Sequence, residues 1–149
     1  MNSLFDFYKA IADFANRHRM IDFFKVISSV EEIGTMNLTH RSLLLTVEST
    51  NISRELNYIS VTMSVFVVDK CIAEDQDSLV ISAQENIFVI SELQDFILGL
   101  DNDVSFQEVI LAQAPETDYT ATAAICQFTA LFNRTSYCDS TSTALNLEE

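Results

Sequence analysis

An acidic stretch in the middle of the chain is the place where residue types and spacing could do chemistry. The segment VFVVDKCIAEDQDSLV, residues 65–80, ends an apolar run at Asp69 and then adds Glu74, Asp75 and Asp77. Clustered carboxylates can bind a metal ion or act as a general base. The same residues can also end a strand, form a polar loop and begin a helix, so the neighbouring elements decide between these interpretations.

The metal hypothesis lacks the spacing of a calcium loop, in which alternating Asp or Asn residues are followed by Gly. Asp75 and Asp77 are two residues apart, but Ser78 follows and begins an apolar run. Helix capping explains more, because Asp77 or Ser78 can accept from the first free N–H groups and acids favour the positive helix end. We predict a structural stretch whose only further role is electrostatic contact at an interface or a lumen. The residues predicted for that contact are Asp69, Glu74, Asp75 and Asp77.

Other catalytic patterns are missing from the sequence. The two histidines, His18 and His40, have no metal-binding or nucleophile motif around them. The two glycines, Gly34 and Gly99, are too far apart for a phosphate-binding loop. The three cysteines have no zinc-finger spacing. We therefore expect no enzyme activity, no cofactor and no metal.

Composition and charge restrict the class of protein further. The 149 residues are 48% hydrophobic with only two Gly and one Pro, which indicates one domain with a core rather than a turn-dense β-sandwich. The net charge is −14, and residues 71–149 carry fourteen acidic side chains against one basic side chain. Such a surface disfavours nucleic-acid and anionic-membrane binding. It favours a basic protein partner, or it serves solubility alone.

Apolar spacing predicts the elements that hold this stretch. Helices are predicted at 2–18 and 78–98, the second ending at Gly99, and strands are predicted at 23–30, 41–49, 57–68, 103–112 and 119–134. The expected fold is α+β, an antiparallel sheet of about four to five strands with two helices packed on one face. We expect one domain over residues 1–139 and a flexible acidic C-terminal tail over 140–149.

Two rows of small residues lie opposite the apolar rows of the predicted strands, and they offer either a plain surface or a flat subunit contact. The rows are Tyr58, Ser60, Thr62 and Ser64, and Thr120, Thr122, Ala124 and Cys126. Phe66, Phe128 and Phe132 fall on the same alternation and are predicted to be exposed, which favours a contact.

The order of elements resembles that of the tail-terminator or tail-completion proteins of tailed bacteriophages. Four segments carry the resemblance: LFDFYKAIADFANRH, FKVISSVEEIG, VTMSVFVVDKCIAEDQDSLVISAQENIFVISELQDFI and ETDYTATAAICQFTALFNRTSYC. Together they span about residues 1–139. The chain departs from the family where DYTAT replaces a Gly-Trp type of turn, so a neighbouring neck, adaptor or minor tail protein fits as well.

The resemblance implies a homo-oligomeric ring, possibly a hexamer, at the head-proximal end of a phage tail. It implies tail-tube and neck or portal proteins as partners, DNA that passes through without specific binding, and no membrane contact. The implied location is the virion, after synthesis in the host cytoplasm. Two alternatives stay open: a small acidic adaptor for a basic protein, and a metal-dependent enzyme that uses the four acids.

Overall fold

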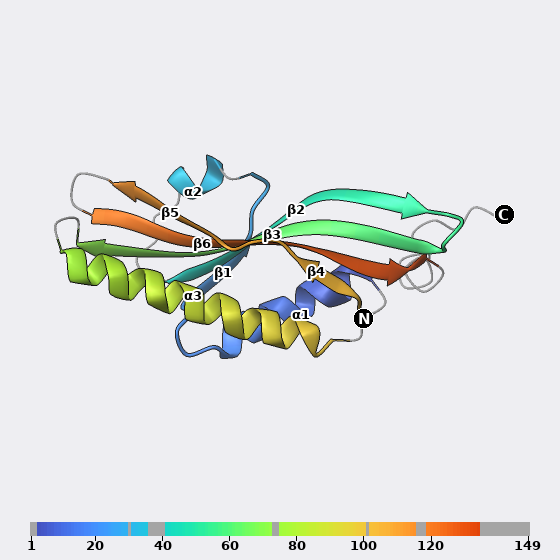
Figure 1. The fold of residues 1–149 in the computed structure, drawn as a ribbon, viewed down its shortest axis with the longest axis horizontal. Helices are drawn as coiled ribbons and strands as arrows, with labels where there is room; N and C mark the ends of the chain where they lie inside the picture. Colours follow the sequence, from blue (N-terminus) through green and yellow to red (C-terminus); the bar gives the residue numbers. More distant parts are fainter. Residues whose placement is uncertain are drawn as a thin grey trace.

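The computed structural model describes residues 3–29, 31–35, 41–72, 75–100, 102–115 and 119–134. The elements in chain order are α1 (Leu4–Arg17), β1 (Phe23–Val26), α2 (Glu31–Thr35), β2 (Ser42–Ser53), β3 (Tyr58–Ile72), α3 (Gln76–Leu98), β4 (Val104–Phe106), β5 (Ile110–Pro115) and β6 (Tyr119–Asn133). The strands form one layer, with α1 and α3 on one side and the short α2 on the other (Figure 1).

The sheet has six strands in the order β1-β2-β3-β6-β4, and β5 also pairs with β6. All pairs are antiparallel except β1 with β2, which are parallel. The predicted α+β class is confirmed, but the sheet is mixed rather than purely antiparallel. The difference arises because β1 and β2 are consecutive strands joined through α2, a connection long enough to bring the chain back in the same direction. The single strand predicted at 103–112 is two short strands, both laid along β6.

The main core lies between the sheet and the two long helices. Phe7 of α1 packs against Phe128 and Phe132 of β6, with ring centroids 5.9 Å apart in both pairs. The C-terminal half of α3 adds further apolar side chains to the same core, among them Val89 and Leu93. Because burial of apolar area is the main favourable term in folding, this layer holds α1 and α3 on one face of the sheet.

A smaller apolar cluster covers part of the opposite face. Its buried members are Ile27, Leu44, Phe66 and Val68, with Ile33 of α2 packed against them. The predicted hydroxyl row of β3 does lie on this face, because its residues alternate with the core residues of the same strand.

The predicted exposure of three phenylalanines is wrong. Phe128 and Phe132 are buried beneath the helices, and Phe66 is buried in the smaller cluster. The row predicted to be exposed on β6 also points toward the helices: Thr120, Thr122, Ala124 and Cys126 are all buried. The physical reason is that β6 is a central strand covered by α3, so its even-numbered residues face the main core.

The hairpin between β2 and β3 is longer than the sequence indicates. Residues 49–56, predicted as a loop, continue β2 as far as Ser53, with a register shift between Val47 and Ser49. Asn57 has a positive φ of 57°, a conformation that Asn adopts more readily than most residues, and it closes the turn. The outer half of β2 therefore extends past the region that β1 covers.

Candidate functional site

The four acids predicted as one contact do not lie together. Asp69 lies within β3, which continues to Ile72, so the prediction that Asp69 ends the strand is wrong. Its side chain is only 20% exposed because it pairs with Arg41 instead of water. Asp75 and Asp77 lie at the start of α3, and Glu74 lies outside the described residues.

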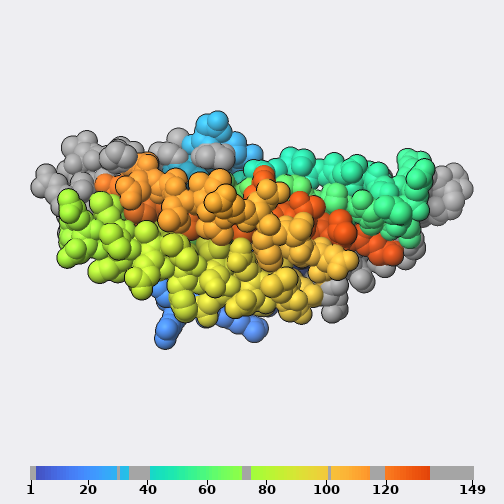
Figure 2. Space-filling model, in the orientation of Figure 1, coloured from blue at the N-terminus to red at the C-terminus, as the bar shows by residue number. Residues whose placement is uncertain are grey.

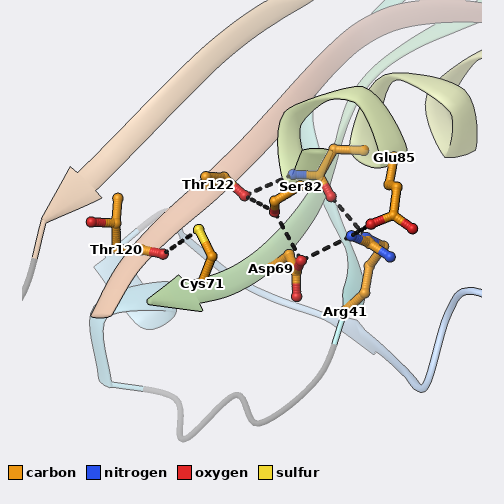
Figure 3. A network of polar contacts seen from close by, with 8 residues as sticks. Arg41, Asp69, Cys71, Ser82, Glu85, Thr120 and Thr122 are labelled. Carbon is orange, nitrogen blue, oxygen red and sulfur yellow. Dashed lines mark hydrogen bonds and ion pairs between the residues drawn. The ribbon is translucent and has the colours of Figure 1, made fainter. Parts of the chain in front are cut away.

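Arg41, the residue before β2, is the centre of a polar network (Figure 3). Its side chain is 10% exposed. Its Nη2 donates to Asp69 Oδ2 at 2.8 Å and to Glu85 Oε1 at 3.3 Å, while its Nε donates to Asn86 Oδ1 at 2.9 Å. One guanidinium thereby connects the start of β2 to β3 and to α3.

The network continues between α3 and β6 through uncharged groups. Ser82 Oγ donates to Asp69 Oδ2 at 2.8 Å and lies 2.6 Å from Thr122 Oγ1. Asn86 Nδ2 donates to Thr122 Oγ1 at 3.1 Å. Because the Ser82 hydroxyl proton is used for Asp69, Thr122 donates its own proton to Ser82 and accepts from Asn86, so the chain of bonds is self-consistent.

These contacts explain an unusual orientation of the first half of α3. Ser82 and Asn86 are buried, whereas Val80 and Ile81 on the same half are 67% and 55% exposed. A buried polar group costs free energy unless it is hydrogen-bonded, and here β3, β6 and Arg41 supply the partners. The polar network therefore fixes the rotation of the helix and leaves apolar side chains on the outside.

Two cysteines adjoin this region. Cys71 Sγ donates to the carbonyl oxygen of Thr120 at 3.4 Å, and its pKa is raised above the usual thiol value by burial and, secondly, by the charge of Asp69. Burial also raises the pKa of Cys126, which accepts from Gln94 Nε2 at 3.4 Å. Because the thiolate is the reactive form, both thiols are weak nucleophiles at neutral pH.

A side chain caps the start of α3, as predicted, but the capping residue is not one of the two that were predicted. Asp75, not Asp77 or Ser78, is the N-cap: its Oδ1 accepts from the Ser78 backbone N–H at 3.1 Å and its Oδ2 from the Ser78 hydroxyl at 2.9 Å. These hydrogen bonds hold the pKa of Asp75 below its usual value. Asp77 follows in the first turn and is exposed, so it has neither the pairing role of Asp69 nor the capping role of Asp75.

A second feature is a groove of about 640 Å³ between α1 and α3. Phe14, Phe96 and Leu100 supply its apolar lining, and His18 lies at one end. His18 Nδ1 accepts from the Met20 N–H at 3.1 Å, so the ring proton is on Nε2, which donates to a carboxylate of α3, Glu92 Oε1, at 2.8 Å. The histidine therefore joins the two helices.

The arrangement of the polar network supports positioning rather than chemistry. Arg41 directs its contacts to groups of the protein itself, and Asp69 uses the same oxygen for Arg41 and Ser82. Across the described ranges, no three His, Cys, Asp or Glu side chains come together in a way that could hold a metal ion. Nor does any helix in those ranges have the length and hydropathy to cross a membrane.

The sequence interpretation missed the network around Asp69. Arg41 and Ser82 bond to Asp69 itself, and Asn86 bonds to Arg41 and to Thr122. One signal was available: Ser82, Asn86, Val89 and Leu93 share a helical stripe, so two polar residues continue the apolar face of α3. The partner strands could not be found this way, because their pairing depends on the sheet order.

Comparison with known proteins adds no relative. No protein-family model matches this chain, and no curated protein is similar enough to be counted as related. The proposed function therefore rests on the residues and their arrangement.

Proposed function

We propose that this chain is a non-catalytic assembly protein that forms a homo-oligomeric ring. The form of ring we propose is the tail-terminator or head–tail joining type, located in the virion at the head-proximal end of a phage tail, without a cofactor. The observation that carries the proposal is the outward apolar face of the first half of α3, which is available for contact with another molecule.

The apolar face is continuous with an exposed strand. Val80, Ile81, Ile87 and Phe88 of α3 are all exposed, and Leu111 of β5 is 53% exposed. Figure 2 shows α3 and β5 side by side on one face of the molecule. Ile87 and Leu111 line one shallow cleft together with the uncharged Ser91 and Gln94. Gln84, also exposed, lies between Val80 and Ile87 on this side of the helix. Exposed apolar side chains that gather on one face, rather than scatter singly, mark protein contacts.

The polar network makes the outward orientation a stable property of the fold. Rotating α3 to bury Val80 and Ile81 would expose Ser82 and Asn86 and remove two of the three partners of Arg41, Glu85 and Asn86. Each buried polar group that loses its hydrogen-bond partner costs about 1–3 kcal/mol. The helix is therefore held with its apolar side chains available for another molecule.

The charge of the chain agrees with a conduit for DNA. A net charge of −14 repels a phosphate backbone, so a ring built from these chains would let DNA pass without binding it. The partners we propose in addition to further copies are the tail-tube and the neck or portal proteins.

The proposal is tested by electron microscopy and light scattering on the purified protein. We expect closed rings with a mass of several 16.8 kDa chains. Because like charges oppose the contact, added salt should favour association rather than weaken it. A monomer at all concentrations and salt levels would contradict the proposal.

A second candidate is a small acidic adaptor that binds a basic protein. The observation in its favour is the exposed acids on α3, among them Asp77 and Asp95, in a region of the chain with almost no basic residues. This function predicts the opposite salt response: a complex with a basic partner that weakens as salt is added.

A further inference from the structure

We propose that copies of this chain join head to tail through the two edges of the sheet, with β5 of one copy pairing antiparallel with β1 of the next. The inference rests on the proposed ring function and names its interface. The two edges are different surfaces, so the contact is head to tail, and repeating it around one axis closes a ring when the rotation per copy divides a full turn.

The β5 edge has the properties of a pairing site. Among the described residues no strand pairs with the side of β5 that faces away from β6. Residues 110–114 are exposed on both faces of the sheet, with Ile110 at 58% exposure and Leu111 at 53%. Residues 110–115 contain no charged side chain. Protein edges are usually protected by charges, prolines, bulges or covering loops. On β5 the one such residue is Pro115 at its end, so residues 110–114 are left as a template for another strand.

The β1 edge offers a matching strand. It is the last strand at the opposite side of the sheet, and Phe23 and Val26 on it are 44% and 43% exposed. Because β1 is parallel to β2 while β5 is antiparallel to β6, β1 and β5 run in opposite directions within one sheet. A second copy placed beside the first in the same orientation would therefore form an antiparallel pair, the commoner kind.

The register of the sheet places specific residues opposite one another. One row crosses the sheet through Ile110, Ile125, Phe66, Leu44 and Lys25. If the next copy continues this row without offset, its Lys25 lies opposite Ile110, and its Phe24 lies opposite Leu111. The exposed Glu108 precedes β5 by two residues, so in this placement it comes near Lys25 of the next copy and gives the contact one complementary charge pair.

The same placement covers the apolar face of α3. Helix α1 lies over β1, where Tyr8 and Phe24 have ring centroids 6.1 Å apart, and α3 lies beside β5 on the same face of the sheet. The α1 of the next copy would therefore come to lie beside Ile87. The edge contact and the helix contact would form together, so one neighbouring copy would cover both the β5 edge and the apolar face of α3.

A second copy is the occupant that the charges favour. Chains of net charge −14 repel each other, and they can approach closely only where each surface is nearly neutral. β5 has no charge, and β1 carries only Lys25, whose predicted partner Glu108 has the opposite sign. The two edges thus complement one another, whereas pairing β5 with β5 would bring two Glu108 side chains into the same interface.

A mixing experiment with two edge variants tests the inference. Ile110→Lys alters the β5 edge, Phe23→Lys alters the β1 edge, and Leu56→Lys, at a 70% exposed position in the turn after β2, is the matched control. We expect rings from the wild type and from the control, and monomers from each edge variant by light scattering. An equimolar mixture of the two edge variants should give heterodimers, because one intact edge of each kind remains.

The possible outcomes distinguish failure of the proposed β5–β1 interface from failure of the proposed ring function. If the wild type forms rings and both edge variants still form them, the inference is wrong and the ring function stands. If only Ile110→Lys fails to assemble, the contact joins two β5 edges and the inference is also wrong. A monomeric wild type would overturn both.

Exchanging the charges of Glu108 and Lys25 distinguishes loss of the contact from unfolding of the variants. Glu108→Lys and Lys25→Glu should each reduce the fraction of assembled protein, and the double variant should restore it, while Glu55→Lys in the turn after β2 has no effect. Failure of the double variant to regain assembly, with the melting temperature unchanged in all four proteins, would contradict the proposed register.

Discussion

Replacing Arg41 by Met should destabilise the protein far more than replacing an exposed charged side chain. Methionine keeps the apolar stem of the side chain but removes every hydrogen bond to Asp69, Glu85 and Asn86. Asp69 then retains only the bond from Ser82, and Asn86 Oδ1 loses its donor. Glu85 is 43% exposed and can return to water at little cost.

The loss of unfolding free energy expected for Arg41→Met lies between two known limits. Breaking a fully buried ion pair costs about 3–5 kcal/mol, whereas an exposed pair contributes about 0–1 kcal/mol. Arg41 and Asp69 are 10% and 20% exposed, close to the buried limit but with some access to water. We therefore expect Arg41→Met to lower the free energy of unfolding by about 2–4 kcal/mol. In an Asp69→Asn background the loss should be smaller, because the ionic part of the contact has already gone.

Urea denaturation followed by circular dichroism measures this loss, at two protein concentrations so that assembly is separated from folding. The control is Arg17→Met, since Arg17 pairs with Asp13 at 3.8 Å with both side chains largely exposed. The control should change stability by less than about 0.5 kcal/mol. If Arg41→Met costs no more than Arg17→Met, the polar network does not fix α3 and the reasoning fails.

Three further predictions concern α3 and the thiols. Asp75→Ala should lower the melting temperature, and Asp75→Asn should lower it less, because Asn can still accept from the Ser78 N–H but removes the charge. Since the pKa of Asp75 is lowered, its charge contribution is present above the usual Asp pKa and is lost as pH falls through the folded value, which a pH series of melts would check. Asp77→Lys should lower the melting temperature slightly, because it reverses a favourable charge in the first turn of α3, while it reduces any binding of a basic partner in a pull-down. The raised pKa values of Cys71 and Cys126 predict that the stability of the fold falls as pH rises from the usual thiol pKa through the folded values. Mass spectrometry should show that iodoacetamide modifies Cys126 more slowly than the less buried Cys71.

The long elements could be predicted from the sequence because each carries a clear apolar period. Helical spacing over residues 2–18 indicated α1, whose buried residues are Phe7, Ile11 and Ala15, and the alternation from Ile59 to Val67 indicated most of β3. The second long helix was found within two residues of its observed start. These segments bury one face each, so local pattern and final burial agree.

The site could be predicted only in part, since its contacts are non-local. Asp69 was selected for its charge, but its position in β3 follows from pairing with β6, in which Asp69 is opposite Thr122. Arg41 lies 28 residues from Asp69 along the chain and 45 from Asn86, and nothing in the sequence connects them. The strand β1 was predicted within 23–30, but its parallel direction was missed, because four residues are too few to reveal a direction.

The measurement that tests the central claim most directly is the mass of the purified protein in solution as a function of concentration and salt, by sedimentation or light scattering. Our account predicts one closed assembly of several 16.8 kDa chains, more populated as salt screens the like charges of the copies. A 16.8 kDa species that persists across the micromolar range at low and high salt would contradict it.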